Sequence, residues 1–176
     1  MTMWVFGYGS LVWNPGFEVS HQMIATLPGY ARSFCMRSIH HRGTDEAPGL
    51  VLALDENHTD SCQGVALAVV EGQEAQTLEY LRARELISSA YLERDLEIRL
   101  EDGRTARAVT YVIDPHHVQY CGGLPLEEQA RIIAQAVGGR GPNTEYLYNT
   151  ADYLAQLGIS DSQLEWLSKR VRSLCA

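Results

Sequence analysis

The stretch Gly7-Tyr8-Gly9-Ser10-Leu11 contains the residue types that point most directly to chemistry. Glycines one residue apart let backbone N–H groups approach a bound anion at little steric cost, which suits a carboxylate or a developing oxyanion. A plain tight turn after a strand is the equal alternative from the spacing alone. A dinucleotide-binding loop is excluded, because Val12 stands where its third small residue is needed.

Glu85 is the second candidate, as a general acid or base. It ends a helix predicted over residues 71–85, with apolar neighbours at Leu81, Leu86 and Ile87. We therefore expect a partly buried carboxylate. Burial raises the pKa of a carboxyl group toward neutrality, which acid–base catalysis near pH 7 requires. The alternative is an ordinary surface residue paired with Arg82 or Arg84.

Other reactive residue types give weaker patterns. The pairs His40-His41 and His116-His117 have neither of the usual metal-ligand spacings, and adjacent histidines on one backbone chelate poorly, so we predict no metal site. Ser10 lacks the flanking glycines of a nucleophile elbow. Cys35 stands in an apolar run and is predicted to fill the core.

Short β-prone segments must position these residues. They cover residues 4–6, 31–37, 50–54, 63–70, 91–100 and 105–113. Asp102-Gly103 predicts a hairpin between the last two segments. We expect a break at Pro28-Gly29, a long polar loop over residues 41–48 and no helix directly after the glycine turn.

Helical patterns dominate the chain from about residue 124. After the first helix over residues 71–85, they predict helices over residues 126–137, 143–157 and 160–174. Asn143 or Thr144 is expected to cap the second of these, and Ser160 with Gln163 to form a capping box for the last. Strands followed by helices favour an α+β domain with an antiparallel or mixed sheet, open or closed into a barrel.

Composition limits the class of protein. The 176 residues suit one domain over residues 1–176, and 14 basic against 22 acidic residues give a net charge of −8, which disfavours nucleic acid and anionic membranes. No apolar run is long enough to span a bilayer, and the N-terminus lacks the features of a signal peptide. Four cysteines without a C-x-x-C motif favour reduced thiols and a cytoplasmic protein, with two disulfides left open.

Several motifs occur in an order that is specific when taken together. They are Met3–Trp13, Ser38–Gly43, Pro48–Leu54, Cys62–Ala66, Tyr80–Glu85 followed by Tyr91, and Gly139–Leu147. Over residues 3 to about 157 the chain thereby resembles the ChaC family, the glutathione-specific γ-glutamylcyclotransferases. The resemblance implies a γ-glutamylcyclotransferase-like mixed or antiparallel β-barrel with surrounding helices.

The resemblance also implies an enzyme, a carbon–nitrogen lyase of the amine-lyase type, that converts glutathione to 5-oxoproline and Cys-Gly. It implies a small-molecule substrate and no metal or organic cofactor. From the acidic composition we expect no nucleic-acid or membrane partner, and we expect a monomer or weak homodimer. The rival hypotheses are a cyclotransferase acting on other γ-glutamyl amides or amines, and a non-catalytic metabolite-binding regulator of cation transport. A titratable Glu85 argues against the regulator.

The same resemblance implies the site residues. Glu85 would be the catalytic acid and base. The γ-glutamyl group would bind Val5, Phe6, Gly7, Tyr8, Gly9, Ser10 and Leu11, and Tyr91 and Tyr146 would line the pocket. Relatives commonly carry glycine after the catalytic glutamate, whereas this chain has Ser88-Ser89-Ala90, so the expected departure is in substrate preference.

Overall fold

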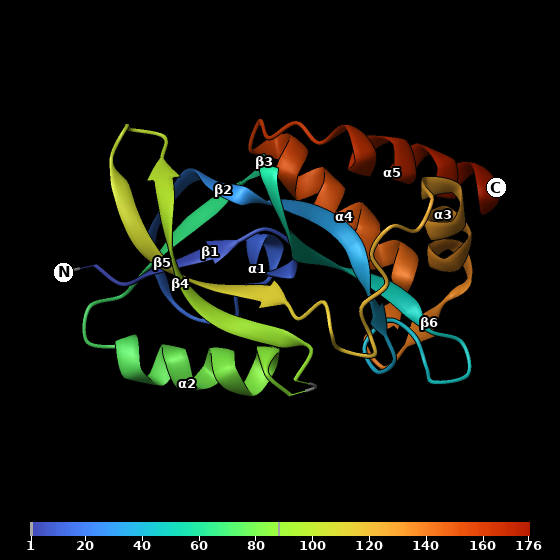
Figure 1. The fold of residues 1–176 in the computed structure, drawn as a ribbon, viewed down its shortest axis with the longest axis horizontal. Helices are drawn as coiled ribbons and strands as arrows, with labels where there is room; N and C mark the ends of the chain where they lie inside the picture. Colours follow the sequence, from blue (N-terminus) through green and yellow to red (C-terminus); the bar gives the residue numbers. More distant parts are fainter. Residues whose placement is uncertain (1, 88) are drawn as a thin grey trace. The chain divides into compact units, whose positions relative to one another are not determined.

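The computed structural model describes residues 2–87 and 89–176, which form two compact units. The first unit contains residues 1–32 and 53–118, and the second contains residues 33–52 and 119–176. The ribbon in Figure 1 follows the chain through five barrel strands and the helices. The expectation of one domain over the whole chain stays a prediction, and Ser88 lies outside the described residues.

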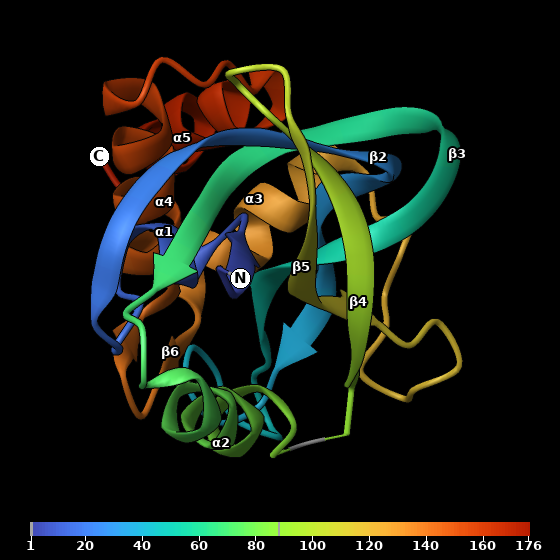
Figure 2. The same ribbon diagram turned by 90° about the vertical axis from the view of Figure 1, so that its left-hand side faces the viewer.

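Five strands form a closed barrel. Its strands are β1 (Trp4–Gly7), β2 (Val19–Ser38), β3 (Gly49–Val69), β4 (Tyr91–Leu100) and β5 (Thr105–Ile113). They follow the order β1-β3-β2-β4-β5, with β1 antiparallel to β3 and parallel to β5, so the predicted mixed barrel is confirmed. Figure 2 shows the ring of strands with α2 (Glu74–Glu85) below it.

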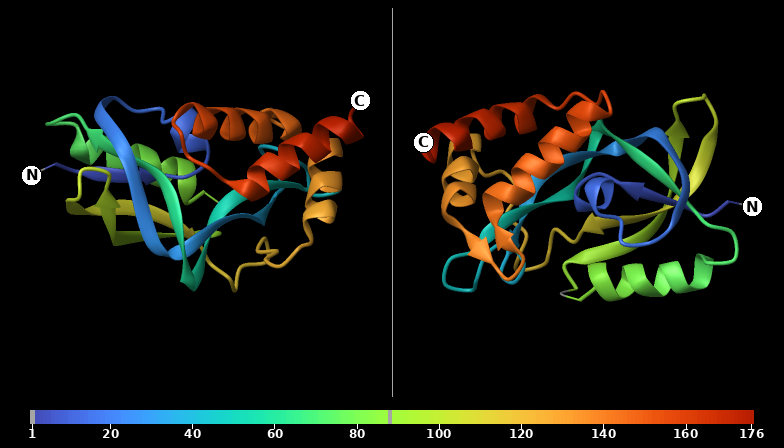
Figure 3. Two further views of the ribbon diagram at one scale, coloured as in Figure 1. Left: turned by 90° about the horizontal axis from the view of Figure 1, so that it is seen from above. Right: turned by 180° about the vertical axis from the view of Figure 1, so that it is seen from behind.

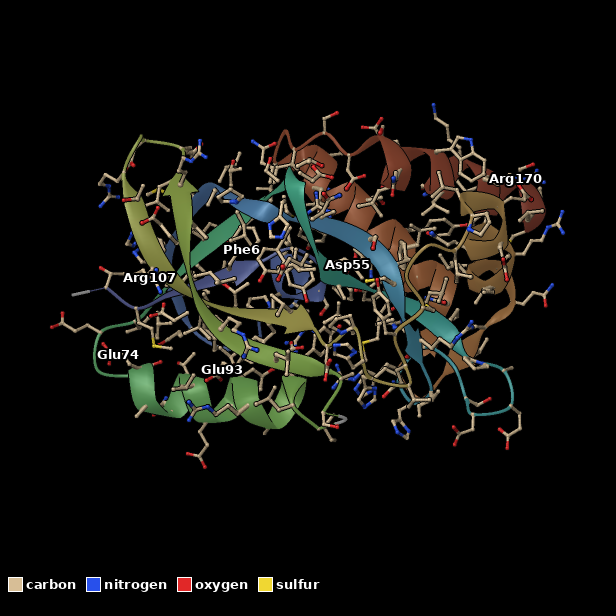
Figure 4. The ribbon with its side chains drawn as sticks, in the orientation of Figure 1. Phe6, Asp55, Glu74, Glu93, Arg107 and Arg170 are labelled. Carbon is tan, nitrogen blue, oxygen red and sulfur yellow. The ribbon has the colours of Figure 1, made fainter. Side chains whose placement is uncertain are left out.

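The short strand β1 is buried along its whole length. Val5 and Phe6 are fully buried, and Figure 4 shows Phe6 in the middle of the strands. Phe6 pairs with Ala66 and Gly7 with Val65 on β3. A Cβ atom on Gly64 would overlap the carbonyl oxygen of Gly7, so the close approach of β1 and β3 requires glycine there.

Strands β2 and β3 are much longer than the sequence predicts. The expected break at Pro28-Gly29 is wrong, because β2 continues through it with Gly29 at φ +85°. Barrel strands coil strongly, and a proline–glycine pair supplies a bend without ending the pairing. Strand β3 likewise runs through the exposed polar residues 56–61, which a hydrophobic pattern cannot distinguish from a loop.

The helices confirm the predicted number of long segments but correct several ends. They are α1 (Ser10–Trp13), α2, α3 (Leu126–Gln135), α4 (Asn143–Gln156) and α5 (Ser162–Leu174). The one-turn α1 follows the glycine turn, where no helix was expected. Helix α3 ends early because Ala136 is extended and leads into the hairpin of β6 (Val137–Gly138) and β7 (Gly141–Pro142).

Two predicted helix caps are also wrong. Asp161, rather than Ser160, caps α5, since its carboxylate accepts the N–H of Leu164 at 3.0 Å. Helix α4 has no side-chain cap, because the Asn143 side chain bonds the backbone of Leu50 instead. Figure 3 shows α3, α4 and α5, coloured orange to red, packed together in the second unit.

Candidate functional site

The glycine turn presents a row of backbone donors. Strand β1 ends at Gly7 and α1 begins at Ser10, and the N–H of Val12 donates to the Gly9 carbonyl at 3.0 Å. Within residues 2–87 and 89–176, the N–H groups of Gly9, Ser10 and Leu11 have no protein acceptor. Neighbouring backbone N–H groups without a protein acceptor are donors that a bound anion could use.

Long-range hydrogen bonds fix this turn. The Tyr8 hydroxyl donates to the Tyr111 carbonyl oxygen at 3.0 Å on β5. From β2, the Arg32 guanidinium donates to the carbonyl oxygens of Tyr8, at 3.2 Å, and of Gln63, at 2.9 Å. The side chains of Val5, Phe6 and Tyr8 are buried, and the β1 backbone pairs with β3 and β5, so substrate binding by residues 5–8 stays a prediction.

Glu85 is the last residue of α2, and only 15% of its side chain is exposed. Its Oε1 lies 3.3 Å from the Arg84 Nε. Both features anticipated for Glu85, burial and an arginine neighbour, are therefore present. Leu81 is fully buried as expected, but Ile87 is 73% exposed because the helix has ended before it.

Arg82, the other arginine proposed as a partner of Glu85, binds Glu93 on β4 instead. Its Nε and Nη2 donate to the two Glu93 carboxylate oxygens at 3.0 and 2.9 Å. Figure 4 shows Glu93 between β4 and α2. The Arg82 hydrogen bond holds the pKa of Glu93 below its ordinary value. Burial, and then a 2.8 Å hydrogen bond to Glu93, raise the pKa of Tyr111.

Arg84 is the residue that the sequence analysis missed. Its Nη2 donates to the Ser10 Oγ at 3.0 Å, and its Nη1 donates to the Asn14 carbonyl oxygen at 2.7 Å. Together with the Nε–Glu85 contact, these bonds join the glycine turn to the end of α2. The only sequence signal was its place directly before Glu85, which by itself suggests an exposed ion pair.

The two predicted pocket tyrosines lie in different units. Tyr91 begins β4 in the first unit, half-buried and opposite Ile113. Tyr146 is buried on α4 in the second unit, where its hydroxyl accepts the N–H of Leu52 at 3.1 Å and its ring meets Phe34 edge to face. Substrate binding by either tyrosine stays a prediction.

Other features bear on the class of site. Among the described residues, no group of three or more His, Cys, Asp or Glu side chains is placed to hold a metal ion. None of the helices traced in residues 2–87 and 89–176 has both the length and the apolar character needed to cross a bilayer. None of the four cysteines is joined in a disulfide within the described residues.

Comparisons with known proteins agree with this architecture. The family model described as "ChaC-like protein" matches residues 3–174. A glutathione-specific γ-glutamylcyclotransferase of Escherichia coli (strain K12) is 38% identical, covering 99% of this chain and 74% of the relative. The γ-glutamylcyclotransferase 2-3 of Arabidopsis thaliana is 35% identical, covering 99% of this chain and 90% of that relative.

Solved structures support the fold class. The crystal structure of a γ-glutamyl cyclotransferase specific to glutathione from yeast superposes with a TM-score of 0.87. The match covers 100% of both chains at 24% sequence identity, so it speaks for the fold alone. The predicted γ-glutamylcyclotransferase-like barrel is thereby confirmed. The family model and the two relatives, which extend over nearly the whole chain, show that this protein belongs to the ChaC-like family.

Proposed function

We propose that this protein is an enzyme that cleaves the γ-glutamyl bond of glutathione by intramolecular cyclisation, releasing 5-oxoproline and Cys-Gly. The observation that carries the proposal is the turn with unbonded N–H groups over residues 9–11, joined through Arg84 to the carboxylate of Glu85. The E. coli relative, named glutathione-specific, supports the choice of substrate.

Glu85 carries the proton transfer in this reaction. The α-amine of the γ-glutamyl group is protonated in water, so it must lose a proton before its nitrogen attacks the γ-carbonyl carbon. The new bond closes a five-membered ring, and the bond to the cysteine nitrogen breaks. The α-nitrogen gives up two protons in all, one before attack and one as the ring closes. Glu85 accepts one of them and delivers a proton to the departing amine; the other leaves to solvent, from which the released amine takes up its further proton.

The glycine turn binds the γ-glutamyl group. The N–H groups of Gly9, Ser10 and Leu11 receive a substrate carboxylate or the oxyanion that develops on the γ-carbonyl. Nucleophile and electrophile belong to one molecule, so the protein contributes mainly by folding the substrate into attack geometry. The ring closure requires neither a metal nor an organic cofactor.

In this proposal the enzyme acts on a small molecule, as a monomer or weak homodimer, in the cytoplasm. Four cysteines that are not joined in disulfides within the described residues support a reducing compartment. A net charge of −8 supports the absence of nucleic-acid partners.

The test measures 5-oxoproline and the matching amine product from reduced glutathione, γ-Glu-ε-Lys and γ-Glu-Ala. The native chain should act on glutathione, and Glu85→Gln should not. Glu79→Gln is the matched control, because Glu79 is an exposed acid on the same helix. Turnover of the other γ-glutamyl compounds would move the protein to the broader cyclotransferase class. Binding without turnover of any of them would favour the regulator.

A further inference from the structure

Arg84 is buried to a degree that an arginine tolerates only when its donors are satisfied. Its side chain is 9% exposed, although it stands in the last turn of a surface helix. Besides its hydrogen bonds to Ser10 and Asn14 and its ion pair with Glu85, Arg84 donates through Nη1 to the Pro15 carbonyl oxygen and to the Tyr80 hydroxyl, both at 3.1 Å. The guanidinium is therefore surrounded by groups of the glycine turn region and of α2.

The two arginines near the end of α2 use the same edge of the guanidinium differently. Arg82 directs Nε and Nη2 at the two oxygens of one carboxylate, the usual bidentate pairing. Arg84 divides this edge, with Nε beside the Glu85 Oε1 and Nη2 on the Ser10 Oγ. Because the guanidinium is planar and rigid, it fixes the Ser10 hydroxyl and the Glu85 carboxylate relative to each other.

The Arg84 bond also sets the direction in which Ser10 can act. A hydroxyl has one proton to donate and two lone pairs to accept with. Arg84 occupies a lone pair, so the Ser10 oxygen is an acceptor in this bond and its proton is left to donate elsewhere. No described residue accepts that proton. The Ser10 hydroxyl thus adds a fourth donor beside the N–H groups of residues 9–11.

The segment after α1 holds Arg84 in place. The carbonyl oxygens of Asn14 and Pro15 both accept from Nη1, and Gly16 follows at φ +76°. A Cβ atom on Gly16 would overlap the Tyr80 hydroxyl, which itself accepts from Arg84. Close packing around Arg84 therefore restricts the orientation of its guanidinium group.

We propose that Arg84 is a positioning residue for the cyclisation, holding the Ser10 hydroxyl as a donor toward the bound γ-glutamyl group and holding the Glu85 carboxylate at a fixed place beside it. This inference rests on the proposed glutathione cyclotransferase function. Arg84 does its work through Ser10 and Glu85, not by contacting the reacting atoms itself.

The test is a double-mutant cycle with Arg84→Lys and Ser10→Ala, followed by release of 5-oxoproline from glutathione. Lysine keeps the charge and the alkyl stem but has no rigid fork. We expect kcat to fall roughly 10- to 100-fold in Arg84→Lys with KM changed less than about threefold, since misplacement of catalytic groups costs rate on that scale. In the Ser10→Ala background the same change should cost clearly less, because one of its targets is gone.

Controls separate this role from folding. Arg107→Lys is the matched control: Arg107 also donates to a backbone carbonyl, that of Asp95 at 2.7 Å, and lies 3.6 Å from the Asp95 carboxylate, yet it sits on β5 (Figure 4) and should keep native kcat. Thermal unfolding identifies variants that lose the fold, and Arg84→Gln, which keeps an N–H donor, replaces Arg84→Lys in that case.

Unchanged kcat in Arg84→Lys, or effects of Arg84→Lys and Ser10→Ala that simply multiply, would overturn the positioning role while leaving the cyclotransferase function standing. A native chain that releases no 5-oxoproline would overturn the function and this inference together. A reduced kcat with near-native KM and a non-multiplicative cycle supports the inference.

Discussion

The glycine turn of the first unit and the residues around Asn143 in the second unit differ in whether their polar groups are hydrogen-bonded within the protein. In the second unit, buried Asn143 accepts the Leu50 N–H and donates to the Leu50 carbonyl, both at 2.8 Å. Arg42 donates to the Pro142 carbonyl oxygen at 3.0 Å. In the first unit, the N–H groups of residues 9–11 have no acceptor in the part of the chain that the structure describes.

Both regions lie in motifs by which the sequence resembles the ChaC family, and such a motif alone does not distinguish a binding residue from a structural one. Hydrogen bonding does. The Asn143 side-chain amide accepts the Leu50 N–H and donates to the Leu50 carbonyl, so both of these buried backbone groups are hydrogen-bonded. The glycine turn keeps donors available for a ligand. We therefore expect changes in the turn region to affect turnover and changes around Asn143 to affect stability.

The largest expected effect is on turnover in Glu85→Gln. Glutamine keeps the size and hydrogen-bonding capacity of the side chain but cannot exchange a proton, so kcat should fall by about 10²- to 10⁴-fold or more. Thermal unfolding should match that of the native chain. Near-native turnover in a folded Glu85→Gln protein would remove Glu85 from the mechanism.

Asn143→Ala should have the largest effect on stability. It leaves the N–H and the carbonyl of Leu50 without partners in a buried site, and each such group costs about 1–3 kcal/mol of unfolding free energy. Denaturant unfolding should show the loss, while turnover per folded molecule stays native. Asn57→Ala, at an exposed position of β3, is the control and should change the unfolding free energy by less than about 0.5 kcal/mol.

Tyr146→Phe tests whether Tyr146 stabilises the second unit, binds substrate, or does both. The change removes the acceptor of the Leu52 N–H, so it should cost about 1–2 kcal/mol of unfolding free energy. A role in the substrate pocket would add a rise in KM for glutathione. Tyr153→Phe, on the exposed part of the same helix, should change neither quantity. A native KM in Tyr146→Phe would assign the hydroxyl to the fold alone.

The sequence predicts the local features well. The glycine turn, the Asp102-Gly103 hairpin and the helical character of the C-terminal part depend on short-range preferences and are found in the structure. The continuous β2 and β3 were missed because barrel closure pairs strands across Pro28-Gly29 and across polar residues whose side chains face water. Tertiary pairing there outweighs the local break signals.

In the candidate site, too, the sequence predicts residue types and local positions but not the contacts between residues far apart in the chain. The types and places of Gly9, Ser10 and Glu85 are readable from motifs, whereas the bonds of Arg84 to Ser10 and Asn14 join residues 74 and 70 positions apart. Periodicity on one helix says nothing about such contacts. The Asn143 side chain shows the converse: it has the chemistry of a helix cap, but the strand backbone at Leu50 competes for it and binds it.

The smallest expected effect is the pH dependence of stability contributed by Glu93. This residue binds Arg82, which lies on the same helix as Glu85. Arg82 lowers the pKa of Glu93 in the folded protein. A carboxyl group with a lower pKa in the folded state than in the unfolded state stabilises the protein at pH values above its unfolded-state pKa, which is about 4.3 for glutamate. This stabilisation is lost as the pH falls from there through the folded-state pKa. Glu93→Gln should therefore lower the Tm at pH 7, and its difference from the native chain should shrink below about pH 4.

Thermal unfolding of the native chain and Glu93→Gln between pH 7 and pH 3 measures this difference. Exposed Glu97, on the same strand, provides the control, and Glu97→Gln should follow the native curve throughout. A Glu93→Gln deficit that stays constant down to pH 3 would mean that Glu93 contributes through packing and neutral hydrogen bonds. In that case the Arg82–Glu93 pair would resemble the neutral Asn143–Leu50 contacts, and the charged contacts that matter in the first unit would be those of Arg84.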